Sequence, residues 1–515
     1  MRDSASETAP EHRAHRAHEG PYDLAVIGAG PAGLAGAVTA AELGLSVALL
    51  DSSAQPGGQY YRHPDPALGA TRPEALHHDW AAFADLRHRL DSGTVTRLAR
   101  HHVWTVVRED SGDSGDGGAA EGGEDLWAVH AVTGSDGCGG GERPVRLRAR
   151  AVLLATGTYE RHLPFPGWTL PGVVAAGGAQ AMLKSGLVLP GSRVVVAGSG
   201  PLLLAVAASL ASAGAQVPAV VEASGYLAYA REPRALLANP HKLLEGATHG
   251  AALLRHRVRP LVRSAVTHAH GTDRVAAVTV SRLDRDWRPV PGTGRRIACD
   301  ALAIGHGLVP QLELATGLGC ATRRTPDGTH ALALNALQST SVPGVYAAGE
   351  AGGVGGAPLA LAEGELAGIA IAARTLGRPA LLDGPRVREL RRRRRRLRAF
   401  AEVMARAHAP GERWTRWLDD ATDVCRCEEV TAGSVREAID VYGARDARTV
   451  KLLTRAGMGW CQGRMCGTAV ACLAAGAARA PQSPPPERRP LSVPVPLGVL
   501  AAVDGDEEGP PMADG

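Results

Sequence analysis

The stretch "VIGAGPAGLAG" (Val26–Gly36) decides the fold of this 515-residue chain. It places Gly28, Gly30 and Gly33 in G-x-G-x-x-G spacing, after an apolar run and before a run rich in small residues. The first glycine permits a tight turn, the second lets backbone approach a pyrophosphate, and the third lets a helix pack closely on its strand. The start of that helix offers free N–H groups and a partial positive charge to phosphates. The pattern predicts a strand–turn–helix nucleotide site.

The next apolar run, "LSVALLD", supplies the acidic residue that such a site needs. It ends at Asp51, 23 residues after Gly28, where a carboxylate can accept hydrogen bonds from a ribose. A glycine pattern alone is weak because glycine-rich turns are common. Strand, helix and acidic residue together, at the required spacing, favour a dinucleotide site over a purely structural turn.

A second unit of the same type begins at "RVVVAGSGP", which contains Gly198 and Gly200. Leu203 stands where the third glycine or alanine is expected, and Glu222 follows 24 residues after Gly198. A carboxylate there suits a ribose 2′-hydroxyl and would repel a 2′-phosphate, which favours NAD or another adenine nucleotide over NADP. A degenerate fold that binds nothing, or that binds a nucleotide without hydride transfer, is the open alternative.

Composition excludes several classes of protein. With 45% hydrophobic residues, 64 glycines and only 4% aromatic residues, the chain suits an α/β fold. Its net charge of +4 argues for neither nucleic acid nor membrane as a partner, and Gly and Pro interrupt the charge-free stretch 194–221, so no membrane span is expected. Eight cysteines, four of them grouped, indicate metal or redox use in a cytoplasmic protein rather than a disulfide scaffold.

The grouped cysteines follow a C-x-C pattern, 33 intervening residues, and then C-x4-C. They are Cys425, Cys427, Cys461 and Cys466. Zinc ribbons generally use two C-x-x-C knuckles, whereas the glycines of "GMGWCQGRMCG" allow N–H groups to point at sulfur atoms and stabilise an anionic cluster. Four thiolates suffice for one [2Fe–2S] centre. The spacing favours this cluster, with a structural zinc as the alternative.

Two later segments resemble the motifs of two-dinucleotide-binding flavoproteins. They are "ATGTYE" (155–160) and "TSVPGVYAAGEAGG" (340–353). The resemblance implies FAD in the first site, with Glu350 in the place of the acidic residue that binds the ribityl chain, where the family more often has Asp. In "PGGQYYR", Gln59 stands where this family passes its backbone beside the flavin, although a loop cap is the alternative for this residue. The other cofactor-binding residues implied are Thr156, Gly157 and Gly349.

The cysteine region carries a second resemblance. "CRCEEVTAGSVREAI" and "GMGWCQGRMCG" resemble the [2Fe–2S] module related to bacterioferritin-associated ferredoxin, except that the second pair there is C-x-x-C. The C-x4-C form is similar to the version fused to flavoprotein subunits of opine oxidase, hydrogen cyanide synthase and heteromeric proline or hydroxyproline dehydrogenases. The order of motifs matches that family over about residues 22–475. Cys472 is expected to be a helix residue and not a ligand.

The expected architecture is α/β: a flavoprotein of two Rossmann-like units followed by a small, mostly helical [2Fe–2S] module. The expected segments are a disordered tail (1–21), an FAD-binding domain (22–165 and 300–378), an inserted nucleotide-binding domain (166–299), an arginine-rich helical linker (379–418), the [2Fe–2S] domain (419–480) and a disordered tail (481–515). The acidic glycine/serine segment 110–125 is expected to be an insertion between two strands. Six consecutive arginines, 391–396, predict a solvated linker helix or a docking site for an acidic partner.

The resemblance implies an FAD- and [2Fe–2S]-containing oxidoreductase subunit. In that family the chain would relay electrons within a multi-subunit dehydrogenase for opines, proline, hydroxyproline or sarcosine-like amines. A second flavoprotein subunit would oxidise the substrate, and an external acceptor would take the electrons. We assign no catalytic residue, because the sequence offers no convincing acid–base pair. The alternatives are a self-sufficient NADH-dependent flavoprotein reductase, or a non-catalytic nucleotide-binding protein with a structural zinc.

Overall fold

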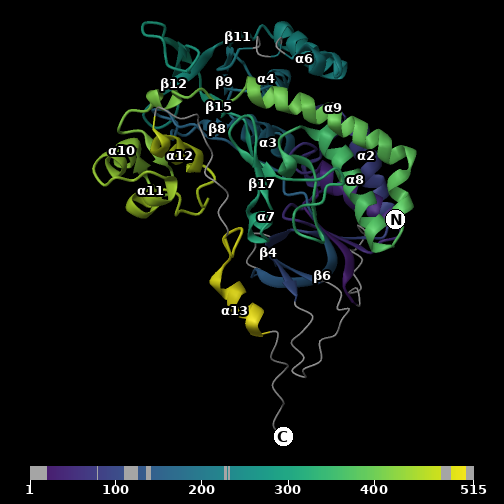
Figure 1. The fold of residues 1–515 in the computed structure, drawn as a ribbon. Helices are drawn as coiled ribbons and strands as arrows, with labels where there is room; N and C mark the ends of the chain where they lie inside the picture. Colours follow the sequence, from purple (N-terminus) through teal and green to yellow (C-terminus); the bar gives the residue numbers. More distant parts are fainter. Residues whose placement is uncertain are drawn as a thin grey trace, which may run out of the picture.

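The structure is a computed structural model that describes residues 20–77, 79–109, 126–134, 141–225, 229, 232–476 and 489–505. Figure 1 shows two sheet-containing units, a long helix along one side and a small helical module on the other. Three expectations fall wholly or partly outside the described residues: nearly all of the tail 1–21, the insertion 110–125, and residues 481–488 and 506–515 of the C-terminal tail.

The first unit is built on a seven-stranded sheet of order β3-β2-β1-β6-β5-β4, with β19 also paired to β6. Its strands are β1 (Tyr22–Ile27), β2 (Val47–Asp51), β3 (Val95–Ala99), β4 (His101–Glu109), β5 (Leu126–Thr133), β6 (Arg143–Leu154) and β19 (Val345–Ala347). The pairs β3–β2, β2–β1, β1–β6 and β6–β19 are parallel, whereas β4, β5 and β6 pair antiparallel. The insertion 110–125 therefore joins two strands, as predicted.

Helices α1 (Pro31–Glu42) and α8 (Ala357–Thr375) pack tightly together against this sheet. Small residues make this possible, since a Cβ at Gly364 would lie 2.1 Å from the carbonyl oxygen of Ala32. The remaining short elements of this unit are η1 (Pro66–Leu68), η2 (Pro73–Leu76), α2 (Trp80–Ser92), β7 (Thr158–Glu160), β16 (Leu308–Pro310), α7 (Glu313–Gly317), β17 (Thr322–Arg324), β18 (His330–Leu332), η4 (Gly349–Gly352) and η5 (Pro379–Asp383).

The second unit has a parallel five-stranded sheet of order β11-β10-β9-β15-β8. Its elements are β8 (Val173–Ala175), α3 (Ala176–Gly186), β9 (Val194–Gly198), α4 (Leu202–Ser212), β10 (Ala219–Glu222), α5 (Pro233–Leu237), α6 (Pro240–Arg255), β11 (Arg259–Val262) and β15 (Ala301–Gly305), with an antiparallel sheet of β12 (Ser264–His270), β13 (Ala277–Arg282) and β14 (Arg295–Ala298). The predicted boundary at residue 299 is wrong by one strand, because the fully buried β15 completes this sheet.

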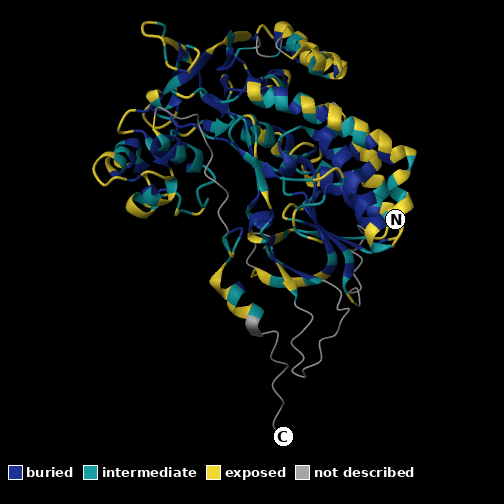
Figure 2. Cartoon of the chain, viewed as in Figure 1, coloured by how far each residue is buried: buried dark blue, intermediate teal, exposed yellow. Residues whose placement is uncertain are grey.

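Helix α9 (Pro385–Ala407) contains the arginine run and lies along the outside of both units (Figure 1). It is a helix, as predicted, but only part of it faces solvent: its buried side includes Leu390 and Leu397 and packs on α8 (Figure 2). After η6 (Trp414–Trp417) come the elements of the cysteine module: β20 (Asp423–Cys425), β21 (Val430–Thr431), α10 (Ala432–Asp440), α11 (Ala447–Thr454) and α12 (Gly467–Ala475).

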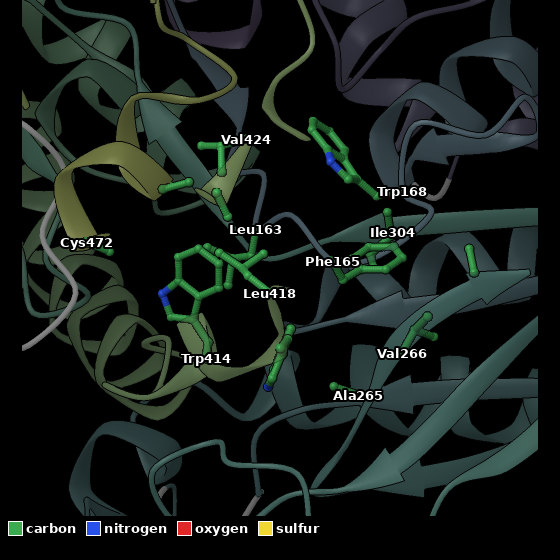
Figure 3. Close-up of a cluster of buried hydrophobic side chains, with 14 of the residues drawn as sticks. Leu163, Phe165, Trp168, Ala265, Val266, Ile304, Trp414, Leu418, Val424 and Cys472 are labelled. Atoms are coloured by element: carbon green, nitrogen blue, oxygen red, sulfur yellow. The ribbon is translucent and has the colours of Figure 1, made fainter. Parts of the chain in front are cut away.

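The cysteine module and the second unit share one continuous hydrophobic core. Val424 and Leu418 of the C-terminal region lie in the same cluster of buried side chains as Leu163 and Phe165, which join the two sheets (Figure 3). The cluster extends to Ile304 of β15. The module is therefore packed onto the second unit and is not tethered to it by a loose linker.

The predicted disordered tail from residue 481 is wrong for residues 489–505. Helix α13 (Leu497–Gly505) and the segment before it pack on β4, where Val493 and Val499 are buried against Trp104. The hydroxyl of Ser492 donates to the carbonyl oxygen of Trp104 at 2.8 Å. The prolines and charges of this segment suggested disorder, but the apolar residues between them bury the otherwise exposed apolar side chains of β4. In the described part of the chain, no helix is long and apolar enough to span a membrane.

Candidate functional site

The first glycine loop has the shape that its sequence predicts. Gly28 follows β1 with φ +104°, and a Cβ on it would lie 2.4 Å from the carbonyl oxygen of Ala155. A Cβ on Gly33 would lie 1.8 Å from the carbonyl oxygen of Gly28. Gly30 precedes the helix start, where a Cβ would meet nothing closer than 4.0 Å. Two glycines are thus required by the packing of the loop, and the third leaves open backbone at the N-terminus of α1, as a phosphate site requires.

Asp51 lies at the carboxyl end of β2, beside this loop. Its Oδ2 accepts a hydrogen bond from the Ala29 N–H at 2.5 Å, and its Oδ1 accepts one from the Ser53 N–H at 2.6 Å. These bonds hold the carboxylate at the edge of the loop, and its side chain stays partly exposed. This is the place from which a carboxylate reaches a ribose in the dinucleotide fold.

The segment that contains Gln59 closes over the glycine loop. Gly57 donates its N–H to the carbonyl oxygen of Ala29 at 2.8 Å, and a Cβ on Gly58 would lie 2.8 Å from the Cα of Gly30. Gly58 has φ +58°, so the chain turns sharply and leaves Gln59 exposed at the rim. The structure therefore brings Gln59 to the edge of the site, and its contact with a flavin stays a prediction.

The "ATGTYE" segment also lies at this site. The Ala155 N–H donates to the carbonyl oxygen of Ile27 at 2.9 Å, which places Thr156 and Gly157 next to the glycine loop. The Thr156 hydroxyl donates to the carbonyl oxygen of Gln311 at 2.7 Å, and Gly157 has φ +73°. Both residues shape the turn after β6.

Glu350 meets the start of α8 rather than open space. Its Oε1 accepts the Gly356 N–H at 2.9 Å and its Oε2 accepts the Gly355 N–H at 3.0 Å. Burial raises the pKa of this carboxyl, although the two N–H groups oppose that shift. The neighbouring Gly349 has φ +77° and donates its N–H to Glu363 at 3.1 Å.

Sequence reasoning missed the ion network behind this loop. Glu363 of α8 is fully buried, and its Oε1 accepts from Arg398 Nη2 at 2.6 Å and from Arg394 Nε at 3.1 Å. Arg398 also donates to the carbonyl oxygen of Gly353 at 2.5 Å. Two glutamates inside a run of small apolar residues, "PLALAEGELAG", were the signal, because a carboxylate buried in such a helix needs a partner. Arg394 of the arginine run and Arg398, just after the run in α9, thus hold the predicted flavin loop in place.

The second glycine loop brings its predicted residues together in a different way. Gly198 has φ +135°, and a Cβ on it would lie 1.7 Å from the carbonyl oxygen of Gly305. Glu222 is 2% exposed and accepts the Gly200 N–H at 3.0 Å. Leu203 is buried against the strands, and the first turn of α4 is tighter than that of α1, with the Leu203 N–H bonded to Gly200 at 3.2 Å.

A side chain from far along the sequence covers this second loop. His408 follows α9, and its Nδ1 lies 3.5 Å from Glu222 Oε1 and 3.4 Å from the hydroxyl oxygen of Ser199. Its Nε2 lies 2.9 Å from the hydroxyl oxygen of Tyr229. His408 is itself buried. The imidazole therefore contacts the carboxylate that the sequence predicts to bind a ribose, and no local sequence pattern indicated this contact.

The four cysteine sulfurs gather at one end of the module. Cys425 and Cys466 are buried neighbours, while Cys427 is exposed and its Sγ lies 3.7 Å from that of Cys461. Burial, with Cys425 as a neighbour, raises the pKa of Cys466. All four are free thiols. Among the residues that the structure describes, no three His, Cys, Asp or Glu side chains are set to hold a single metal ion.

Glycines bring the two cysteine segments into contact. A Cβ on Gly459 would lie 2.2 Å from the Cβ of Cys427, and Gly457, with φ +89°, approaches Cys466 Sγ. At this close approach the backbone N–H of Cys461 is hydrogen-bonded to Cys427 and stabilises its thiolate. The other described cysteines lie outside this group: Cys472 is a buried residue of α12, a helix as predicted, Cys299 is buried in the second unit, and the buried Cys320 donates to the Thr340 hydroxyl at 3.5 Å.

One cleft lies between the cysteine module and the flavin motif. It is partly open to solvent and has a cavity volume of about 130 Å³, and its lining includes Tyr159 of "ATGTYE" and Cys466. Arg464 and Glu313 face each other across it, with 2.9 Å between Nε and Oε1. The cleft shows that the two predicted redox regions, about 300 residues apart in the sequence, are neighbours in the fold.

Comparison with known proteins assigns the nucleotide-binding units and the cysteine module to known families. Residues 22–364 match the pyridine nucleotide-disulphide oxidoreductase family, and residues 424–475 match the BFD-like [2Fe–2S] binding domain. The chain therefore belongs to the pyridine nucleotide-disulphide oxidoreductase family and carries a BFD-like [2Fe–2S] binding domain at its C-terminal end. It is a flavoprotein-type oxidoreductase, as the two motif resemblances implied.

The relatives narrow the class. The chain is 35% identical to hydrogen cyanide synthase subunit HcnB of Pseudomonas aeruginosa, over 86% of this chain and 90% of the relative. It is 34% identical to an opine oxidase subunit of Rhizobium meliloti, over 88% of this chain and 92% of the relative. Among solved structures, L-proline dehydrogenase from P. horikoshii superposes with a TM-score of 0.63, covering 93% of this chain and 79% of that one at 20% identity, which shows a shared fold.

Proposed function

We propose that this chain is the FAD- and [2Fe–2S]-containing, electron-relaying subunit of a multi-subunit amine or amino-acid dehydrogenase. The observation that carries the proposal is the cleft that joins the flavin motif at Tyr159 to the cysteine module at Cys466. The matched relatives support it, because HcnB and the opine oxidase relative are each one subunit of an enzyme.

The residues of the first unit fit FAD. Gly30 leaves open backbone at the N-terminus of α1 for the pyrophosphate, and Asp51 would accept hydrogen bonds from the adenosine ribose. Gln59 lies at the rim, within the segment that closes over the loop. When bound, FAD accepts two electrons as a hydride, and an iron–sulfur cluster exchanges them singly. The chain's own residues orient these groups and separate them from water.

The thiols of the module fit a two-iron cluster better than zinc. They form two neighbouring pairs, Cys425 with Cys466 and Cys427 with Cys461, as suits two irons with two thiolates each. A structural zinc would need all four around one ion. The exposed Cys427 lies on the outer side of the module, where an external electron acceptor can approach.

The proposed substrate class is supported by the relatives and not by a catalytic residue in this chain. We propose a secondary amine, such as an opine, proline, hydroxyproline or a sarcosine-like compound, oxidised on a second flavoprotein subunit. The second nucleotide fold would hold NAD or another adenine nucleotide only after His408 moves from Glu222. Electron relay is therefore favoured over a self-sufficient NADH-dependent reductase.

The test is a visible absorption spectrum of anaerobically purified chain, with iron, sulfide and zinc measured on the same sample. Flavin bands with about two irons and two sulfides per chain are expected. The isolated chain should not oxidise NADH steadily. Flavin with one zinc and no iron would contradict the relay, and steady NADH turnover would favour the reductase.

A further inference from the structure

An arginine stands between two of the cluster cysteines and rests on an aromatic ring from outside the module. Arg426 separates Cys425 from Cys427, and its guanidinium carbon lies 5.4 Å from the centroid of the Trp168 ring. Trp168 is 4% exposed and belongs to the segment that joins the sheets of the two units. This distance is within the range of a cation–π interaction.

The same tryptophan also holds the backbone of the first cluster segment. Its Nε1–H donates to the carbonyl oxygen of Asp423 at 2.7 Å, at the start of the short strand that ends in Cys425. A single side chain therefore fixes both the position of β20 and the direction of the Arg426 charge. Both contacts bridge about 255 residues of sequence.

The segment that carries Trp168 is rigid. It reads "LPFPGWTLPG" (163–172), and three prolines restrict its backbone. Gly167 has φ +81°, and a Cβ on it would lie 2.1 Å from the carbonyl oxygen of Ala269, so the chain is held against β12 at this point. Phe165 is 1% exposed in the shared core (Figure 3). The Trp168 ring is thus held in a fixed position, and the exposed side chain of Arg426 packs against it.

We propose that Trp168 is a positioning residue that fixes the guanidinium of Arg426, the residue between Cys425 and Cys427, and that this charge raises the cluster's reduction potential. The inference rests on the proposed function, because it requires the [2Fe–2S] centre. A centre held by four thiolates is anionic and gains a further negative charge on reduction, so a fixed cation favours the reduced form. The packing of the two nucleotide-type units would in this way set how readily the module accepts an electron from the flavin.

The test is a redox titration of the cluster by EPR in the full-length chain. Arg426→Gln should lower the midpoint potential of the cluster. Arg426→Lys keeps the charge, so its midpoint potential should lie between those of Arg426→Gln and the wild-type chain. Trp168→Leu should lower the potential by less than Arg426→Gln, because the charge stays but moves toward solvent. Trp168→Phe keeps a ring under the guanidinium and should lie nearer to the wild-type protein. Arg445→Gln, which removes an exposed charge from the turn before α11, is the matched control and should leave the potential unchanged.

The double variant separates positioning from a general packing role. If Trp168 acts through Arg426, Trp168→Leu should cause little further shift in the Arg426→Gln background. The shifts should also shrink as salt is added, because Arg426 is exposed. Iron and flavin contents are measured on every variant. An unchanged potential in Arg426→Gln, or fully additive shifts, would overturn the inference while the proposed function stands; wild-type chain with flavin and no iron would overturn both.

Discussion

The two glycine loops of this molecule share a motif and differ in what their carboxylates contact. In the first, Asp51 bonds to the N–H of Ala29 and stays partly exposed. In the second, Glu222 is 2% exposed, bonds to the N–H of Gly200, and faces the imidazole of His408. The first carboxylate can meet a ribose, whereas the second already meets a side chain of its own protein.

The contrast between the loops indicates that a glycine motif determines the shape of the backbone turn and does not by itself determine which ligand binds there. Gly28 and Gly198 are equally indispensable to their turns, since a Cβ on either would collide with a carbonyl oxygen of a neighbouring strand end. What differs is the third position, where Gly33 is replaced by Leu203, and the helix end that returns to the loop with His408. The second unit has the same strand–turn–helix fold, and the cysteine module shares its hydrophobic core.

The largest effect should come from adding a side chain to a tightly packed glycine of the first glycine loop. Gly33→Ala would bring a methyl group to 1.8 Å from the Gly28 carbonyl oxygen, so α1 must move away from β1. We expect loss of bound FAD and of more than about 4 kcal/mol of stability. Gly246→Ala, in α6, is the control, because a Cβ there meets nothing within 4 Å and the residue has no positive φ. FAD content and thermal unfolding of both variants would decide; retained flavin in Gly33→Ala would contradict the comparison.

A second effect concerns the cluster. Cys425→Ser should lower iron from about two per chain to near zero, because a two-iron centre needs all its thiolates. FAD should remain, since its loop lies in the other unit. Cys472→Ser, in a helix of the same module, is the control and should keep its iron. Loss of both cofactors in Cys425→Ser would show that the flavin unit depends on the module.

Much of this molecule could be predicted from local patterns. The turns at Gly28 and Gly198 both need a positive φ, which glycine adopts readily. The spacing from these glycines was enough to place Asp51 and Glu222 at the ends of the following strands. The arginine-rich helix was also predicted, because a run without Gly or Pro favours a helix. Each of these features depends on residues within about one turn or one strand of each other.

The features that escaped prediction depend on contacts between distant residues. Glu363 binds Arg398 from another helix, and Trp168 binds the Asp423 carbonyl across 255 residues. His408 looks like any polar residue at a helix end until the fold brings it to Ser199. A single sequence carries no record of such pairs, because hydrogen bonding at a distance leaves no periodic pattern.

The hydrogen bond between Lys184 and Tyr60, which links the two units, predicts that the free energy of unfolding depends on pH. Lys184 of α3 is buried and donates to the carbonyl oxygen of Tyr60, next to Gln59, at 3.2 Å. Burial lowers its pKa to about 8 from 10.5, so between these values the unfolded chain holds a proton that the folded chain has lost. The free energy of unfolding should therefore rise from pH 8 to 10.5, by at most about 3 kcal/mol from this residue.

The measurement is urea unfolding of the wild-type chain and of Lys184→Met across that pH range. The difference between them isolates Lys184 from the tyrosines that titrate nearby, because Tyr60 and Tyr61 remain in both. Lys184→Met should be the more stable at pH 7, and the gap should narrow as the pH rises. A constant gap would mean that the lysine titrates normally and that the junction beside the flavin loop is open to water.

The smallest effect bears most directly on the comparison. His408→Ala should uncover Glu222 Oε1, which keeps its hydrogen bond from the Ser224 N–H at 2.9 Å. Binding of ADP or NAD should strengthen by about tenfold, which corresponds to about 1.4 kcal/mol for displacing one buried side-chain contact. The gain should vanish in His408→Ala with Glu222→Gln, because the carboxylate is the group that the ribose would reach. Calorimetric titration of wild-type and variant chains with ADP measures both. If the wild-type chain binds ADP as tightly as His408→Ala, the imidazole is no obstacle and the second loop is a nucleotide site like the first.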